Sequence, residues 1–194
     1  MKSTKRVRRE PAEAKSLILG AAEKLMLDEG YGAVSVRAVA KVAGLSSALV
    51  HYYFETTDDL LVMLYRRTSD RDMEYLKDAL SADDPLMALW SYQTDAARTA
   101  LGVEFLALAN HRKVIRTEIS RHAQRARRLQ AKTLARFLDA AGAGVKGCSP
   151  EGTSMLLTSV SRNLIMETAV GISLGHADAR AYIIQELGKL RSQR

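Results

Sequence analysis

The segment that most constrains the fold of this chain is SVRAVAKVAGLSSALVHYYFETTDDL, residues 35–60. Its first apolar residues recur at helical spacing and form one face of a short helix, Val36, Val39 and Ala40. Ser35 precedes them as an N-cap, and Gly44 follows them where a residue in the left-handed conformation ends a helix most easily. Ser46 then caps a second short helix. The segment therefore predicts a helix, a glycine-containing turn and a second helix, with the length of a helix-turn-helix unit.

Length and composition indicate a globular, mainly helical protein. The chain has 194 residues, of which 47% are hydrophobic and three are prolines, so it is long enough to bury a large core. The single cysteine, Cys148, excludes an internal disulfide and suits a reducing compartment, so we expect a cytoplasmic protein. No uncharged apolar run approaches the roughly 18 residues of a membrane span, and no apolar segment follows the basic N-terminus as in a signal peptide.

Prolines, glycines and capping residues divide the chain into helices. We expect a first helix over residues 11–29 and a long fourth helix over residues 57–80. Later helices are expected over residues 85–100, 103–110, 111–141 and 150–174, and a last helix after residues 176–178. Gly102 is the expected break between the first two of these later helices. The helix that begins at residue 150 is apolar nearly all round, which indicates burial on more than one side.

The stretch GLSSALVHYYFETTDDL resembles the DNA-binding signature of the TetR/AcrR family of bacterial repressors. That signature is a Gly-hydrophobic-Ser turn, a recognition helix that ends in aromatic residues and a Phe, a Ser/Thr-Lys-acidic cap and a Leu-rich helix. The upstream stretch ILGAAEKLMLDEGYGAVSVRAVAKVAG resembles the first two helices of the family in spacing. The resemblance covers residues 18–64, and beyond them only the helix layout is similar. The family usually has a Lys where this chain has Thr57 and often a Tyr where it has His51, so one ion pair with DNA is expected to be missing.

The resemblance implies an all-α protein. Its parts would be a basic flexible arm (residues 1–10), a three-helix helix-turn-helix DNA-binding domain (residues 11–58) and a helical ligand-binding and dimerisation domain (residues 59–194). It also implies a transcriptional repressor that binds a palindromic operator in double-stranded DNA as a homodimer, formed by the last two helices, and is released by a small-molecule effector. We expect no cofactor, metal, membrane association or enzyme activity, because no HExxH pair, Cys/His cluster or Gly-x-Ser-x-Gly motif occurs.

The second helix of the unit is expected to read DNA with an outward face of small and aromatic side chains. Leu45, Val50 and Phe54 should point inward, so small residues on the opposite face let the helix approach the major groove closely. The residues expected to contact DNA are Ser35, Arg37, Ser46, Ser47, Ala48, Leu49, His51, Tyr52, Tyr53 and Thr57. For Tyr53, packing against Phe54 is an equal alternative.

The net charge of +7 is not concentrated on the helix-turn-helix. Residues 1–57 hold nine Lys and Arg against six Asp and Glu, whereas residues 111–136 hold nine against one. The basic arm either contacts DNA phosphates or the minor groove, or is a solubilising tail. On the helix over residues 111–141 the cations recur every three or four positions, at Arg121, Arg125, Arg128, Lys132 and Arg136. This stripe marks either a solvated face or an attraction for DNA or an anionic ligand, such as an acyl-CoA.

Six polar or aromatic residues on otherwise apolar helices are candidates for effector binding, and each can equally be part of the core: Trp90, Phe105, His111, His122, Asn163 and Met166. Two other functions stay open at this point. One is a helical regulator that acts through protein–protein contacts, and the other is an activator without small-molecule induction. A helical enzyme is disfavoured because catalytic motifs are missing.

Overall fold

The computed structural model describes residues 10–140 and 148–192, which are helical apart from short connections. The helices in chain order are α1 (Pro11–Glu29), α2 (Val36–Ala43), α3 (Ser47–Tyr53), α4 (Thr57–Leu80), α5 (Pro85–Gln93), α6 (Ala96–Ala109), α7 (Lys113–Ala140), α8 (Pro150–Ala169) and α9 (His176–Ser192), and a 3-10 turn (Tyr31–Ala33) joins α1 to α2. The all-α fold expected from the sequence is confirmed. Apart from Glu10, the basic arm lies outside the described residues, as does the segment over residues 141–147.

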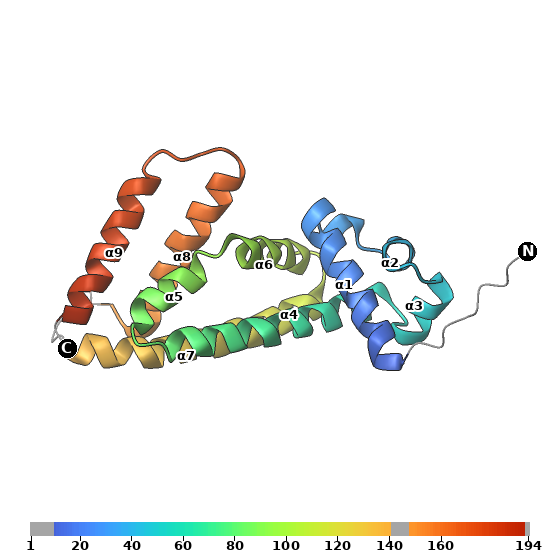
Figure 1. Cartoon of the computed structure of the whole chain (residues 1–194), viewed down its shortest axis with the longest axis horizontal. Helices are drawn as coiled ribbons and strands as arrows, with labels where there is room; N and C mark the ends of the chain where they lie inside the picture. The colour runs from blue at the N-terminus through green and yellow to red at the C-terminus, as the bar shows by residue number, and fades with distance from the viewer. Residues whose placement is uncertain (1–9, 141–147, 193–194) are drawn as a thin grey trace, which may run out of the picture.

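The molecule is elongated, with α1, α2 and α3 gathered at one end and α8 and α9 at the other (Figure 1). Between these ends, α4 and α7 run lengthwise and pack against each other. The 24 residues of α4 correspond to about 36 Å of helix. This single helix therefore extends from the helix-turn-helix toward the opposite half of the molecule.

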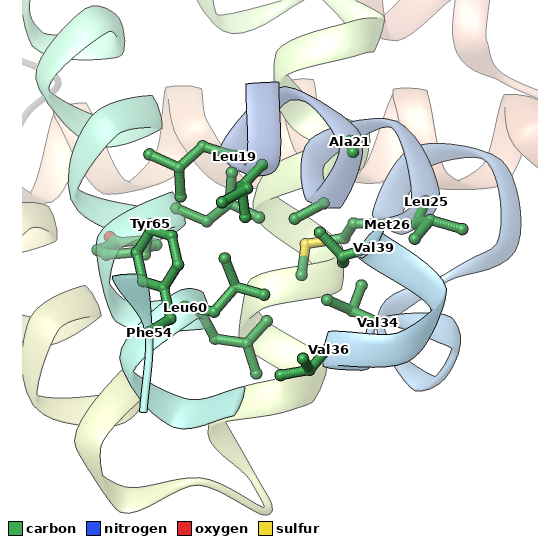
Figure 2. Close-up of a cluster of buried hydrophobic side chains, with 14 of the residues drawn as sticks. Leu19, Ala21, Leu25, Met26, Val34, Val36, Val39, Phe54, Leu60 and Tyr65 are labelled. Atoms are coloured by element: carbon green, nitrogen blue, oxygen red, sulfur yellow. The ribbon is translucent and has the colours of Figure 1, made fainter. Parts of the chain in front are cut away.

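The core under the helix-turn-helix is shared between N-terminal and later helices. Side chains from α1, α2 and α4 meet in it, as the labelled residues in Figure 2 show. Ile18, Val39 and Leu60 have no exposed surface. Phe105 of α6 and Ile115 of α7 belong to the same cluster. Two helices from the second half of the chain thus complete this core. Because the core is closely packed, a displacement of α6 or α7 would displace the side chains that support the helix-turn-helix.

The caps predicted for the helix-turn-helix are confirmed. The hydroxyls of Ser35 and Ser46 each accept a hydrogen bond, 3.2 Å long, from a backbone N–H in the first turn of the helix that follows. Gly44 has a φ of 65° and ends α2 in the left-handed conformation, which a glycine adopts without a Cβ penalty. These local signals explain why two short helices form at these positions.

Two helix boundaries differ from those predicted. The break after α5 falls at Thr94 and Asp95 rather than at Gly102, which lies within α6. Thr94 bonds back to the last turn of α5, and the carboxylate of Asp95 accepts from the backbone N–H of Arg98 at 2.9 Å, so capping outweighs the helix-breaking tendency of a single glycine. Helix α8 ends at Ala169 rather than near residue 174, because Gly171 takes a φ of 83° just beyond it.

A capping box begins α4, and it supplies a test of this local account. The Thr56 hydroxyl accepts from the N–H of Asp59, and the Asp59 carboxylate accepts from the N–H of Thr56, both at 3.0 Å. We expect Thr56→Ala to lower the free energy of unfolding by about 1 kcal/mol, because the first turn of α4 loses its cap. Thr57→Ala, one residue later, is the matched control and should change it by less than about 0.5 kcal/mol. Urea unfolding followed by circular dichroism measures both, and equal effects would contradict the capping account.

Candidate nucleic-acid interface and interior cavity

Helix α3 divides its residues between the core and an exposed face. Val50 and Phe54 are buried and Leu45 is half-buried, as the sequence predicts. Ser46, Ser47, Ala48 and His51 are exposed, and Tyr52 is 79% exposed. A tyrosine with so little packing on a short, well-anchored helix is available to a partner.

The aromatic end of α3 holds its side chains in different ways. Nδ1 of His51 lies 3.4 Å from the backbone oxygen of Glu55. A carbonyl oxygen accepts only from an N–H, so this contact requires the hydrogen on Nδ1. Nε2 is then available to a partner outside the chain. Tyr53 is half-buried and packs against the core. Its ring meets that of Tyr52 edge to face, with ring centroids 5.1 Å apart. The ammonium of Lys15 lies over the Tyr53 ring, 5.8 Å from its centroid. Tyr53 therefore contacts the core and Lys15, which His51 and Tyr52 do not.

A shallow hollow lies beside α3, and its rim carries two cations of α2. Ser35, Arg37, Lys41 and Ser47 are among the residues that line it, and all four are exposed. Lys41 was not among the residues predicted to contact DNA, although its spacing of four from Arg37 places both on one helix face. This positive rim is suited to the phosphates of a nucleic acid.

The acidic residues at the start of α4 are already engaged. Asp58 pairs with Arg112 at the start of α7, 2.9 Å apart, and Asp59 closes the capping box. Thr57, where the family usually has a Lys, is half-buried, and Leu49 is half-buried too. The interface therefore presents hydrogen-bonding groups and two α2 cations rather than an unpaired acidic cluster.

A cavity of about 590 Å³ lies between α1 and the helices from α4 to α8. Its volume is in the range of small-molecule sites. Phe105 and His122, two of the six candidate effector-binding residues, line it. One wall is the inward face of α7, where the lining residues recur at helical spacing: Ile119, His122, Ala123, Ala126, Arg127 and Gln130.

The other four candidates lie outside the lining. Trp90 is buried in a separate core cluster that also contains Leu134 and Phe137. His111 is exposed and stacks on Tyr31 with ring centroids 6.3 Å apart. Asn163 and Met166 are exposed on α8.

Asp72 is the acidic centre of the cavity. Its carboxylate accepts a hydrogen bond of 2.7 Å from the Tyr92 hydroxyl, and Nε2 of His122 lies 3.6 Å away. Burial, reinforced by the Asp72 charge, raises the pKa of Tyr92 well above its ordinary value, and the same two causes raise the pKa of Tyr65. Both phenols therefore stay protonated, and that of Tyr92 donates its hydrogen bond to Asp72 inside the cavity.

Arg98 fills a cage beside this acidic centre. Its guanidinium lies 4.8 Å from the ring centroid of Tyr92 and 5.1 Å from that of Tyr75. The same group is 3.3 Å from Asp95 and 3.9 Å from Asp72. A cation of the protein itself thus occupies the part of the cavity where aromatic faces and carboxylates come together.

Two arginines in the lining stand without such partners. Arg127 of α7 and Arg162 of α8 form no hydrogen bond or ion pair with any residue of the described ranges. Arg162 is exposed overall, but partial desolvation of its guanidinium beside the cavity, and then the neighbouring charge of Arg127, lower its pKa. Arg127 does not belong to the predicted basic stripe, whose five residues are exposed. The cavity therefore carries positive charge that the lining does not neutralise.

Sequence reasoning missed most of the polar residues of the cavity. Asp72, Arg98 and Arg127 come from three different helices, and no local motif connects them. One signal was available, because Arg127 shares a helix face with the buried Gln130 and thus lies among residues that face inward. The interruption of the apolar helix by Arg162 was a second.

Ion pairs and a hydrogen bond connect helices that line this cavity to α1 and the turn after it, beside the helix-turn-helix. Glu23 of α1, which lines the cavity, accepts from Arg67 at 2.8 Å and from Arg71 at 2.5 Å, both on α4. Glu104 of α6 accepts from the backbone N–H of Tyr31 at 2.8 Å, just after α1. A change in the position of α4 or α6 therefore acts directly on the C-terminal half of α1 and on the turn that follows it.

The described ranges were compared with the requirements of a metal site and of a membrane-spanning helix. Across residues 10–140 and 148–192, no three His, Cys, Asp or Glu side chains gather closely enough to hold a metal ion. Within the same ranges, no helix combines the length and the apolar character that a membrane crossing needs.

The Glu23 contacts predict a pH-dependent contribution to stability. Burial by itself raises the pKa of Glu23, but the hydrogen bonds from Arg71 and Arg67 outweigh it and hold that pKa below its ordinary value. The contribution is therefore complete above the unfolded-state pKa of about 4.3 and is lost as the pH falls through the lower folded-state value. Glu23→Gln should reduce the free energy of unfolding by about 1 kcal/mol at pH 7, since the arginines are partly solvated.

The control for this prediction is Glu13→Gln, an exposed acid on the same helix, which should change stability by no more than about 0.5 kcal/mol. Urea unfolding of both variants between pH 7 and about pH 2 provides the measurement, because the loss falls below the unfolded-state pKa. A Glu23→Gln effect that stays constant across this range, or grows as the pH falls, would contradict the assignment.

Comparison with known proteins places this geometry in a family. Residues 18–64 match the model of the tetR family of bacterial regulatory proteins. A comparison with curated protein sequences finds no match. The matched residues run from α1 through the helix-turn-helix into α4.

Solved structures share the fold over nearly the whole chain. A protein from Pseudomonas aeruginosa PAO1, described as a transcriptional regulator, has a TM-score of 0.74 at 19% identity, covering 96% of this chain and 97% of that one. A TetR-family regulator from Rhodococcus sp. has a TM-score of 0.73 at 22% identity, covering 93% and 98%. A regulator from Saccharomonospora viridis, in complex with choline, has a TM-score of 0.74 at 19% identity, covering 90% and 95%.

At these identities the likeness to solved structures is one of fold, whereas the family match concerns the DNA-reading segment itself. That segment contains the capped turn, the exposed face of α3 and the start of α4. We conclude that residues 18–64 are a DNA-binding domain of the TetR family and that the chain is a DNA-binding transcriptional regulator.

Proposed function

We propose that this protein is a ligand-responsive repressor that binds a palindromic operator as a homodimer and is released by a small-molecule effector. The observation that carries the proposal is the position of the cavity. Its lining includes Glu23 of α1 and Arg71 of α4, which form an ion pair, so a ligand in the cavity touches the contact that joins these two helices. A ligand that fits only one arrangement of α1 and α4 shifts the population toward that arrangement.

We propose residues 11–58 as the DNA-binding domain and residues 59–194 as the ligand-binding and dimerisation domain. The boundary then falls in the first turn of α4. The DNA contacts would come from the exposed face of α3 together with the start of α2 and of α4: Ser35, Arg37, Ser46, Ser47, Ala48, Leu49, His51, Tyr52, Tyr53 and Thr57. The exposure of His51 and Tyr52 and the cations beside α3 support this placement.

The dimer is proposed to form through α8 and α9. Exposed apolar side chains are concentrated on these helices and the turn between them: Met155, Leu156, Met166, Val170, Ile172, Leu174, Tyr182 and Ile184. This concentration of exposed apolar side chains on two neighbouring helices supports an interface between subunits there. Two copies joined there would set the recognition helices at a fixed distance, which must be about 34–36 Å for adjacent major grooves on one face of DNA.

The effector is proposed to act by changing that distance. Helix α4 lines the cavity at one part of its length and begins beside α3 at the other. Two further contacts connect the cavity helices to the DNA-binding end of the molecule. Glu104 of α6 binds the backbone of Tyr31, and Arg112 beside α7 pairs with Asp58 at the start of α4. The choline held by the Saccharomonospora viridis protein supports a small-molecule effector for this chain as well.

DNA recognition by α3 is tested with fragments that the purified protein selects from a random pool. We expect an inverted repeat to be enriched, and His51→Ala and Tyr52→Ala each to weaken its binding by about 1–2 kcal/mol, roughly 5- to 30-fold. Both side chains are exposed, so the loss concerns contacts with DNA and not the fold. Fluorescence anisotropy measures the affinities, and Lys132→Ala, an exposed cation on α7, is the control. Enrichment of no repeat, or parental affinity in both variants, would contradict the proposal.

The dimer surface is tested by introducing a charge. Met166→Glu should convert the dimer to a monomer at micromolar concentration, because a carboxylate would be buried without a partner in the interface. Val114→Glu is the matched control, since Val114 on α7 is 46% exposed and Met166 is 45% exposed. Sedimentation velocity measures the mass of each variant. Dissociation by both variants, or by neither, would contradict the placement of the interface on α8 and α9.

A further inference from the structure

The cavity changes its chemical character along α7. The α7 lining runs from Ile119 to Gln130, which corresponds to about 16 Å of helix. Near Ile119 the wall is apolar and aromatic, because Phe105 and Leu101 belong to the same packed cluster. Near Gln130 the wall is polar and positively charged. A ligand that fills the cavity therefore meets two different environments at its two ends.

The polar end is organised by a network of amide and hydroxyl groups. Gln130 Oε1 accepts from Ser154 Oγ at 2.6 Å and from Gln93 Nε2 at 3.3 Å. Gln93 Nε2 also donates to Thr158 Oγ1 at 3.0 Å, and that hydroxyl donates onward to the Ser154 backbone. The network therefore fixes the Gln93 amide with its NH₂ group toward these acceptors.

This orientation leaves one polar atom unpaired. Gln93 is 8% exposed, and its Oε1 is buried without a hydrogen-bond partner among the residues of the described ranges. Buried acceptors without a partner are costly, so a bound molecule that donates an N–H or O–H to this oxygen gains affinity.

The charge of the cavity is positive at the same end. Each carboxylate of the lining is engaged: Glu23 by Arg67 and Arg71, Asp72 by Tyr92 and His122, and Asp95 by Arg98. Arg127 and Arg162 have no such partner in the described chain. Two guanidinium groups on neighbouring helices can bind one oxyanion through charge-assisted hydrogen bonds.

A cationic ligand fits this lining poorly. The aromatic faces of Tyr75 and Tyr92 and the carboxylates of Asp72 and Asp95 already surround Arg98. An external cation would have to displace this internal one and would meet the unpaired charges of Arg127 and Arg162. Electrostatics therefore favours a ligand of the opposite sign.

We propose that the effector is an amphipathic organic anion, whose carboxylate or phosphate is held by Arg127 and Arg162 and whose apolar body lies against Phe105 and Ile119. A hydroxyl or amide N–H near the anionic end would donate to Gln93 Oε1. Desolvation and then the charge of Arg127 lower the pKa of Arg162, and a bound anion would offset both. This inference rests on the proposed effector site and adds the chemical class of its ligand.

Direct binding to the full-length protein, without DNA, tests the proposal. Isothermal titration calorimetry would compare decanoate, decyl phosphate, decanol and decyltrimethylammonium. We expect decanoate or decyl phosphate to bind at least tenfold more tightly than the alcohol and the cation, and the order of the two anions distinguishes a carboxylate effector from a phosphate. Tighter binding of 3-hydroxydecanoate than of decanoate would support the role of Gln93. Binding of neither anion, or tighter binding of the cation, would overturn the proposal.

Two variants locate the anion site. Arg127→Gln and Arg162→Gln should each weaken binding of the preferred anion at least tenfold and leave decanol binding unchanged. Arg125→Gln removes the same charge from the exposed face of α7 and is the control. Circular dichroism shows whether each variant is folded. Equal losses in all three variants, or in none, would overturn the assignment of Arg127 and Arg162.

The result can be separated from that of the repressor proposal. Affinity for the selected DNA is measured in parallel, with and without the preferred anion. If no anion binds and DNA binding is intact, the ligand class is wrong and the DNA-binding function stands. If the anion binds through Arg127 and Arg162 but DNA affinity is unchanged, the ligand class stands and effector-driven release is wrong.

Discussion

The carboxylate of Glu23 is the interaction on which the connection between the two halves of the molecule depends. It is held by Arg67 and Arg71, one helical turn apart on α4, and it also borders the cavity. Burial opposes its ionisation, yet the two arginines keep its pKa below the ordinary value, so it is a carboxylate at neutral pH. Helix α1 is thereby attached to α4 through charge-assisted hydrogen bonds, which are stronger and more directional than apolar contacts. A molecule bound in the cavity would therefore lie beside the ion pairs that join α1 to α4.

Packing gives the same connection a second basis. The core beneath the helix-turn-helix contains residues of α6 and α7, and Phe105 both completes that core and lines the cavity. Tyr65 of α4 meets Phe105 edge to face, with ring centroids 4.9 Å apart. Close-packed interiors transmit displacements because they contain few voids that could absorb them. The cavity and the DNA-reading unit therefore share a wall of side chains, and any ligand-linked change in that wall is also a change in the support of α3.

The parts of the fold that were predicted correctly depend on local physics. Helices α1 and α4 begin and end where the sequence places a Pro, a Gly or a capping residue, and Ser35, Gly44 and Ser46 act over one helical turn. Where two local signals competed, the prediction was wrong, as at Gly102, because the cap at Asp95 outweighed a single glycine. The cavity was predicted least well. Phe105 and His122 line it, but Trp90 is in a separate core, and Asp72, Arg98 and Arg127 were not singled out.

The sequence alone determined the helix-turn-helix, the family and the all-α class, because periodicity, caps and a motif of neighbouring residues are all readable along the chain. The helix-turn-helix of residues 35–60 needs no distant partner to be recognised, although it needs α6 and α7 to complete its core. Only the tertiary structure decided which charged side chains are paired and which line the cavity without a partner in the described ranges. Arg98 and Arg127 look alike in the sequence, but one lies between two tyrosines and two carboxylates and the other has no partner in the described chain. That difference depends on Asp72 and Tyr75 of α4, which only the tertiary structure brings to Arg98, and it leaves the cavity with a positive charge.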